Sequence, residues 1–289
     1  MTASVHLPVL LHETMKYLQP QKGKRYLDAT VGNAGHSLAL LETGAEVIGV
    51  DQDGAMLKRA SERVKEAGYA DHFTPVHKNF ADALASTPPG SLDGVLFDLG
   101  VSSYQLDTGS RGFSFRFNAL LDMRMDPDNQ QVTARDLVNG LGKNELVELF
   151  ERLGEEPRAK KIAEAIVAAR KVKQITTTDE LATLIESISP RRSHLHPATL
   201  VFQALRMAVN SERGELQAAL PSAWNSLRDK GTLVAISFHS LEDQIVKEFM
   251  TSSNGELMTP KPVTPSAQEL ATNPRARSAK LRVLRKIVV

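Results

Sequence analysis

The sequence predicts an α/β fold in which a parallel sheet carries an inserted all-helical domain, and three observations support this fold class. First, β-rich runs alternate with helical segments early in the chain, at 26–29, 46–50, 73–77 and 92–99. Strands that alternate with helices form parallel sheets covered on both faces. Second, residues 107–210 contain helical patterns but no strand. Third, a β-rich run resumes at 232–238, and the alternating residues 281–289 can end the sheet.

The first half of the chain has local signals for each element. Residues 6–18 predict an extended entry followed by an amphipathic helix, and a turn at 20–23 leads into the first strand. A helix is expected at 36–41. After the second strand, Asp53 can cap a helix whose apolar residues recur at helical spacing.

Beyond the fourth strand the pattern changes. Residues 107–132 are irregular, and helices follow at 143–153, 158–172, 178–188 and 197–210, the third of them with Thr178 as its cap. A helix at 240–250 and a proline-rich surface loop at 260–274 precede the last strand. We therefore expect a sheet domain formed by 1–106 and 211–289, with 107–210 as the inserted helical domain. An insertion at the carboxyl end of a strand lies over the ligand crevice, where a substrate is gripped.

Composition excludes several classes of protein. The 289 residues are 42% hydrophobic and 24% charged, as in globular proteins with a substantial core. No apolar run is long enough to cross a bilayer, and the first residues lack the pattern of a signal peptide, so we expect a cytoplasmic protein without membrane association. Cysteine is absent, which excludes disulfides, thiolate zinc sites, iron–sulfur clusters and cysteine nucleophiles.

The net charge of +1 conceals an uneven distribution. Seven basic residues and one acid occur from Lys261 onward, and 158–173 has six basic residues and one acid. Such segments can bind a phosphate backbone, and they can equally be a solvated helix face and a tail.

Residues 25–53 predict a βαβ unit with a ligand site. Gly32 and Gly35 lie in the turn after the first strand, and Asp51 ends the second. Glycines let backbone N–H groups approach a ligand closely, and a terminal acid can hold two ribose hydroxyls. The unit therefore predicts a nucleoside site, although the turn lacks the G-x-G-x-x-G pattern and could be structural. Asp98, which ends the fourth strand, should lie at the same crevice or cap a helix.

Eight motifs then occur in order from Asp28 to Arg282: D-A-T-x-G-x-x-G-H, G-V-D-Q-D, D-L-G-V-S-S-x-Q-L-D, R-G-F-S-F, D-M-R-M-D, F-Q-A-L-R-x-A-V-N, S-F-H-S-L-E-D and N-P-R-A-R-S-A-K-L-R. The chain resembles, over nearly its whole length, the bacterial 16S ribosomal RNA (cytosine-N4)-methyltransferase family. The resemblance implies a Rossmann-like class I methyltransferase sheet with an inserted helical domain. It also implies S-adenosylmethionine as cofactor, and as partner the 16S rRNA of the small ribosomal subunit, with a P-site cytidine as target.

The resemblance also implies which residues hold the cofactor. The turn would pass under the methionine moiety, Asp51 would bind the ribose, and Phe80 would pack on the adenine. Asp98 and Gln105 would lie near the amino-acid part and the transferred methyl. The implied contacts fall on Gly32, Ala34, Gly35, His36, Asp51, Phe80, Asp98 and Gln105.

The chain departs from the family pattern at Asn33, Ala34, Tyr104 and Gln244. The family commonly has glycine where Ala34 stands. Alanine is a small change if its φ is negative there, and a strained one if its φ is positive.

The absence of cysteine agrees with the implied reaction. Methylation of pyrimidine carbon 5 generally needs a cysteine nucleophile, and radical chemistry needs a cysteine-bound cluster. Direct transfer to a nitrogen or oxygen needs neither. The cytosine amine is a poor nucleophile, and a carboxylate that accepts its N–H would stabilise the developing positive charge. Asp98 is the candidate for this catalytic role.

Two other functions stay open. A non-catalytic, RNA-binding ribosome-assembly factor of the same fold would keep the RNA surface. A nicotinamide-dependent dehydrogenase would share the βαβ unit but has no place for the inserted domain or the basic tail.

The remaining motifs allow weaker predictions. A surface that binds RNA, or packing between domains, would explain the cations and aromatics at Arg111, Phe113, Phe115, Arg116 and Arg124. His239 is expected to be a core histidine. His194 and His196 are too few for a metal site, so none is predicted. The basic tail Arg275 to Lys286 is expected to contact RNA.

Overall fold

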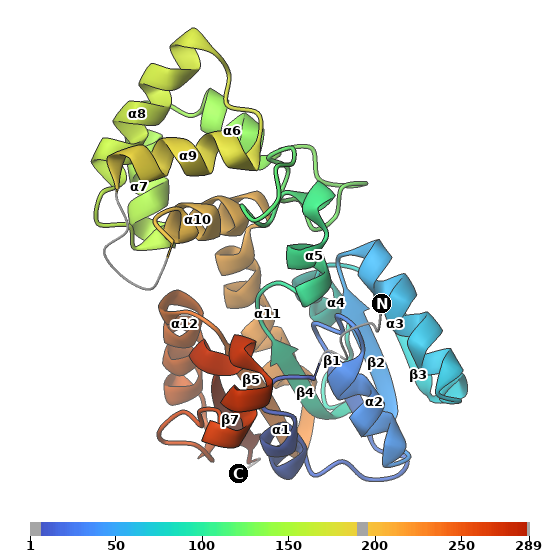
Figure 1. Cartoon of the computed structure of the whole chain (residues 1–289). Coiled ribbons are helices and arrows are strands. Elements are labelled where there is room, and N and C mark those ends of the chain that lie inside the picture. Colours follow the sequence, from blue (N-terminus) through green and yellow to red (C-terminus); the bar gives the residue numbers. More distant parts are fainter. Residues whose placement is uncertain (1–6, 190–195, 288–289) are drawn as a thin grey trace. The chain divides into compact units, whose positions relative to one another are not determined.

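The computed structural model describes residues 7–189 and 196–287, and the chain forms two compact units (Figure 1). The sheet unit comprises Met1–Gly100 and Arg213–Val289, and the helical unit comprises Val101–Glu212. Each unit has its own hydrophobic core, and each is described below by itself.

The sheet unit contains a seven-stranded sheet of order β3-β2-β1-β4-β5-β7-β6. Strands β1 to β5 run parallel, whereas β7 is antiparallel to both β5 and β6. The strand bounds are β1 Arg25–Asp28, β2 Glu46–Asp51, β3 Phe73–His77, β4 Leu92–Asp98, β5 Leu227–Ser237, β6 Gly255–Leu257 and β7 Lys280–Lys286. This arrangement is that of a Rossmann-like class I methyltransferase sheet, so the predicted fold class is confirmed.

The sheet is covered on both faces, as a parallel sheet requires. Successive residues of a strand point to opposite faces, and accordingly Val95 and Phe97 belong to one apolar cluster while Leu96 belongs to another. Helices α2 and α3 pack in the Leu96 cluster, and α4, α11 and α12 pack in the other. The helices of this unit are α1 Leu11–Leu18, α2 Gly35–Glu42, α3 Gly54–Glu66, α4 Phe80–Ala85, α11 Glu212–Ser226, α12 Ser240–Ser252 and α13 Ala267–Thr272.

The helical unit has a core of its own, in which α7 packs against α10 and α8. Gly154, the last residue of α7, lies so close to α10 that a Cβ there would be 2.6 Å from the Leu200 carbonyl oxygen. Its helices are α5 Ser103–Asp107, α6 Ala134–Gly140, α7 Lys143–Gly154, α8 Ala159–Val172, α9 Thr178–Ile188 and α10 Thr199–Val209.

The structure corrects the sequence expectations in three places. The cap of α9 is Thr177, whose side chain accepts from the Glu180 N–H, so the assignment to Thr178 was wrong. Thr178 instead donates its hydroxyl to the Phe117 carbonyl at 2.6 Å. The segment 260–274 is not wholly a loop, because it contains α13, capped by Ser266. Helix α11 was also missed; it carries Pro221 inside it, a residue that usually ends helices.

The irregular segment expected at 107–132 begins with the last residue of α5, contains one short 3-10 helix and one isolated bridge from Leu120 to Thr177, and is otherwise loop. The buried Asn210 holds it in place, accepting from the Met125 N–H and donating to the Met123 carbonyl, both at 2.8 Å. Among the described residues, no helix has the length and apolar character needed to span a membrane.

Candidate active site

The candidate site lies where the strand order of the sheet reverses. Strand β1 pairs with β2 on one side and with β4 on the other, so the carboxyl ends of all three strands meet at one edge. Open α/β sheets bind ligands at this switch point. The turn that leaves β1 there has two residues with left-handed backbone, Gly32 at φ +49° and Ala34 at φ +57°.

Ala34 is therefore the strained case of the two that the sequence left open. A left-handed conformation costs a residue with a Cβ about 1–2 kcal/mol. The fully buried methyl group of Ala34 packs in the apolar cluster of the sheet unit, which offsets part of this cost.

The Asp51 carboxylate forms hydrogen bonds with the loop that follows β1 and with the loop that follows β2. Its Oδ2 accepts from the Gly32 N–H at 3.0 Å, and its Oδ1 accepts from the Asp53 N–H at 2.9 Å. Burial raises the pKa of Asp51 to about 7, because desolvation outweighs these two hydrogen bonds. Asp53 caps α3 through the Ala55 and Met56 N–H groups, which confirms the predicted cap.

Two residues of the D-A-T motif support the site, a function that the sequence reasoning missed. Asp28 is buried and accepts from the Ser37 hydroxyl in α2 at 2.7 Å, and burial raises the pKa of its carboxyl to about 6. The hydroxyl of Thr30 accepts from the backbone N–H of Asp98 at 2.7 Å. In the sequence, the only signal for these roles was that both residues belong to one of the motifs that the chain shares with the family it resembles.

Asp98 and His36 face each other at the end of β4. The Asp98 Oδ2 lies 3.6 Å from His36 Nδ1, while the buried Oδ1 has no hydrogen-bond partner in the described structure. Burial, then the Asp28 and Glu242 carboxylates, hold the pKa of Asp98 well above its usual range. His36 is also buried, and desolvation lowers its pKa to about 4. The imidazole is therefore neutral at physiological pH and provides no compensating charge.

Phe80 is the first residue of α4, and its ring is perpendicular to that of Phe97 of β4, with centroids 5.7 Å apart. Its side chain is half-buried, so part of the ring remains available to a ligand. Asn79 caps α4 through the Ala81 N–H and so sets the position of Phe80.

Gln105 lies in the helical unit and is not among the residues that the sheet unit brings together. Its side-chain oxygen accepts from the Ser102 N–H at 2.9 Å, and Ser102 accepts in return from the Gln105 N–H, which is a capping box for α5. Gln244 is one of the positions at which the chain departs from the family pattern. It is exposed on α12 and donates to Glu248.

The arginines of the R-G-F-S-F and D-M-R-M-D motifs are used inside the helical unit. Arg111 donates to the Arg124 and Met125 carbonyls at 3.0 and 3.1 Å. Arg124 makes a two-point contact with Asp122, both bonds being 2.8 Å long. These contacts favour the packing interpretation of the two arginines.

The neighbouring aromatics are packed as well. Phe113 is buried, and Phe115 stacks on His196 with centroids 4.2 Å apart. His196 also lies 2.8 Å from the Glu186 carboxylate, and His194 falls outside the described residues. Only Arg116 of this group is exposed to solvent.

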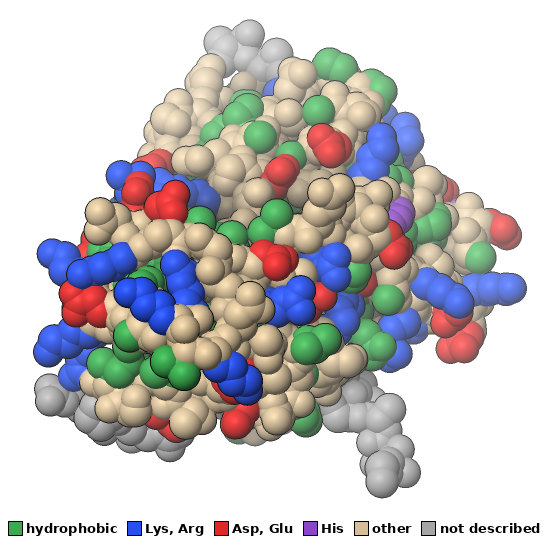
Figure 2. Space-filling model, turned by 90° about the horizontal axis from the view of Figure 1, so that it is seen from above, with side chains coloured by type: hydrophobic (Ala, Val, Ile, Leu, Met, Phe, Trp, Pro, Cys, Tyr) green, Lys and Arg blue, Asp and Glu red, His purple; other side chains and the backbone are tan. Residues whose placement is uncertain are grey.

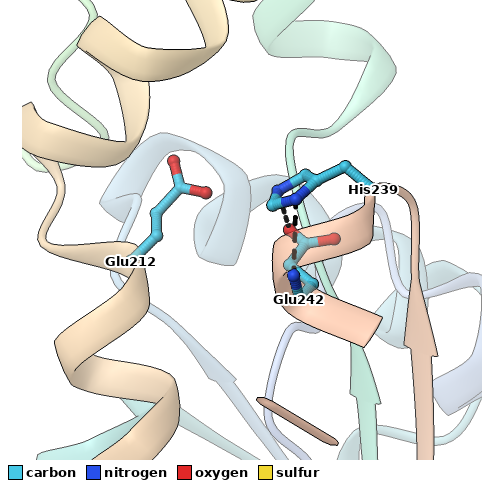
Figure 3. Close-up of side chains that lie close together, drawn as sticks. All are labelled: Glu212, His239 and Glu242. Atoms are coloured by element: carbon cyan, nitrogen blue, oxygen red, sulfur yellow. Dashed lines mark hydrogen bonds and ion pairs between the residues drawn. The ribbon is translucent and has the colours of Figure 1, made fainter. Parts of the chain in front are cut away.

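His239 is half-buried at the start of α12 and is not the core histidine that the sequence led us to expect. It follows β5 and caps α12, with its Nδ1 accepting from the Glu242 N–H at 3.4 Å and its Nε2 lying 2.9 Å from Glu242 Oε1 (Figure 3). Glu212, also drawn there, is the first residue of α11 and the last residue of the helical unit, and it forms a two-point ion pair with Arg206 at 2.7 and 2.8 Å.

Most charges of the basic tail are used within the sheet unit. Lys280 and Arg282 both pair with Asp243 of α12, at 3.1 and 2.6 Å. Lys286 donates to the Trp224 carbonyl in the last turn of α11 and to the Leu227 carbonyl at the start of β5. Arg275 and Arg277 are exposed and stay candidates for phosphate contact. On the face in Figure 2, basic side chains stand among acidic ones and form no continuous basic area.

A family model and relatives similar in sequence indicate one family. The model of the MraW methylase family matches residues 3–287. The ribosomal RNA small subunit methyltransferase H of Thermomicrobium roseum is 44% identical and aligns with 99% of this chain and 94% of its own length. The protein of the same name from a Synechococcus species is 47% identical, over 96% and 91%. A crystal structure of an rRNA methylase from Streptococcus thermophilus superposes over 99% of this chain and 100% of its own, with a TM-score of 0.47 and 12% identity.

Proposed function

The chain belongs to the MraW methylase family, and from this we propose that it N4-methylates a P-site cytidine of 16S rRNA in the small ribosomal subunit, in the cytoplasm. Its cofactor is S-adenosylmethionine. Relatives more than 40% identical over nearly their whole length are named as methyltransferases of small-subunit ribosomal RNA, which supports this substrate.

One observation carries the proposal. Asp98, at the end of β4, keeps a buried carboxylate oxygen without a hydrogen-bond partner in the described structure. A buried polar atom normally has a partner, and leaving one without costs about 1–3 kcal/mol. A substrate N–H group would supply it, so Asp98 suits a site that receives an amine.

The chain's residues fit the cofactor. Asp51 uses one lone pair of each oxygen on backbone N–H groups, and the remaining lone pairs can accept from two ribose hydroxyls. The turn Gly32 to His36 lies beside it and would run under the methionine part. Phe80 offers part of a ring for the adenine. Gln105 stays a proposed cofactor contact from the helical unit.

Each proposed role follows from chemistry. When bound, S-adenosylmethionine supplies an electrophilic methyl group on a sulfonium sulfur. Asp98 would accept an N–H bond from the cytosine amine, orienting its lone pair and stabilising positive charge as it develops on nitrogen. Thr30 holds the backbone N–H of Asp98, so the carboxylate is positioned before the substrate arrives. No nucleophilic side chain is needed, in agreement with a chain that lacks cysteine.

The test uses tritiated S-adenosylmethionine with small subunits that lack the modification, and with naked 16S rRNA in parallel. We expect incorporation that maps to one cytidine and yields N4-methylcytidine. Asp98→Asn is the matched control, because it keeps the size of the side chain and should abolish most incorporation. Tight RNA binding without methylation of either substrate would refute the proposal and favour an assembly factor.

A further inference from the structure

The chain segment that precedes α1 lies directly against the cofactor turn. The ring of Pro8 covers Gly35 so closely that a Cβ on Gly35 would lie 3.0 Å from Pro8 Cβ. The next carbonyl, that of Val9, lies 3.0 Å from His36 Nε2. Residues 7–10, which we call the strap, therefore contact two consecutive residues of the turn.

The strap is held from the other end of the sequence. Glu269 of α13 accepts from the backbone N–H of Leu10 at 2.7 Å, and Asn273 donates to the Leu7 carbonyl at 3.2 Å. Leu10 is fully buried with φ +52°, a conformation that a leucine does not adopt unless its surroundings impose it. Apolar packing adds to these ties, because the strap shares a cluster with Ala34, Ala276, Ala279 and Leu281.

The strap also determines which ring nitrogen of His36 carries the hydrogen. A carbonyl oxygen can only accept, so His36 Nε2 must bear the hydrogen that is donated to Val9. In a neutral imidazole the other nitrogen is then an acceptor, and that nitrogen, Nδ1, faces Asp98 Oδ2 at 3.6 Å. The strap therefore fixes the tautomer of a residue of the cofactor turn.

We propose that the strap positions the cofactor turn, and that Glu269 and Asn273 are positioning residues for S-adenosylmethionine binding although neither belongs to the site. This inference rests on the proposed function, since it takes the turn to be part of the cofactor site. Glu269 acts through Leu10, and the strap acts on Gly35 and His36. The C-terminal segment thereby controls the turn without touching the ligand.

The first experiment measures binding of S-adenosylhomocysteine by calorimetry in the full chain. Glu269→Ala should weaken binding about tenfold, since it removes a hydrogen bond to a charged acceptor that holds the strap. Glu269→Gln keeps an acceptor for the Leu10 N–H and should retain most of the affinity. Glu256→Ala removes an exposed acid of the same C-terminal region and is the matched control, with wild-type binding expected.

Two further measurements separate positioning from general destabilisation. KM for S-adenosylmethionine should rise in Glu269→Ala, while KM for RNA and kcat at saturating cofactor stay at wild-type values. Nitrogen NMR of the His36 ring should show hydrogen on Nε2 in the wild type and a mixture of tautomers in Glu269→Ala. Asn273→Ala, which cuts the other tie, should weaken cofactor binding in the same direction and serves if Glu269→Ala does not fold.

The outcomes distinguish the two proposals. Wild-type binding of S-adenosylhomocysteine by both Glu269→Ala and Asn273→Ala would overturn the strap proposal and leave the proposed function intact. Equal weakening by Glu256→Ala would also overturn it. If the wild-type chain bound no S-adenosylhomocysteine, the proposed function would fail first, and the strap would have no cofactor site to position.

Discussion

Cofactor binding should depend on the ionisation of Asp51. Its pKa of about 7 means that the carboxyl is largely protonated at pH 5 and largely ionised at pH 8. Ribose hydroxyls that donate to Asp51 favour the ionised form, so binding should release a proton at low pH. Two pH units below the pKa, only about 1% of the carboxyl is ionised, and affinity should fall by up to about 100-fold, or about 2.7 kcal/mol.

The measurement is calorimetric titration of S-adenosylhomocysteine between pH 5 and 8, in buffers of different ionisation enthalpy so that released protons are counted. Asp51→Asn is the matched variant, because it removes the titration and keeps the shape. Asp28 and Asp98 also have raised pKa values, so they too can make the affinity depend on pH. The part of the slope of affinity against pH that disappears in Asp51→Asn is therefore the part due to Asp51. An unchanged slope in Asp51→Asn, or a flat wild-type profile between pH 5 and 7, would refute the reasoning.

The same shift has a consequence for the unliganded protein. A carboxyl whose folded pKa is raised binds more protons folded than unfolded, so its stabilising contribution is complete below about pH 4 and is lost as the pH rises through about 7. Urea unfolding at pH 5 and pH 8 should show this loss in the wild type and a smaller loss in Asp51→Asn.

Three substitutions have direct outcomes. Asp98→Asn should lower turnover by about 100- to 1,000-fold at saturating cofactor, because the amide keeps an acceptor oxygen but cannot carry the negative charge that stabilises the developing positive charge on nitrogen. It should not lower the urea midpoint, because the carboxyl of Asp98 is already costly to ionise. Gly112→Ala should destabilise the protein by about 3 kcal/mol in urea unfolding, since φ is +72° and the new Cβ would overlap the Leu120 carbonyl oxygen; a midpoint within error of the wild type would contradict this. Asn210→Ala should cost about 2–4 kcal/mol in the same assay, because the buried Met125 N–H and Met123 carbonyl lose their partner. Equal midpoints for Asn210→Ala and the wild type would mean that other groups satisfy them.

Sequence reasoning located the elements that local chemistry specifies. The run of apolar residues in β4 and the helical spacing of apolar residues in α3 gave the correct element types, and Asp53 was correctly assigned as a cap. It failed where a tertiary contact overrides the local signal. Thr178 looked like a cap, but its hydroxyl is taken by the Phe117 carbonyl, 61 residues away in sequence.

The basic tail shows the same limit. Its positive charges predicted an RNA contact, because a sequence shows charges without their partners. In the structure Lys280 and Arg282 share Asp243 of α12, which lies on a neighbouring element. Only the fold shows which charges remain for a ligand.

The sequence by itself determined the parallel sheet and placed Gly32, Asp51 and Asp98 at its carboxyl edge, because strand periodicity and strand ends are local properties and parallel strands end on the same side. Tertiary structure alone decided how that edge is supported. Thr30 reaches Asp98 across 68 residues, and Glu269 reaches Leu10 across 259. It also decided the pKa values, since these depend on burial. The support of this edge and the pKa values both depend on contacts between segments that are far apart in the sequence, and no local pattern encodes such contacts.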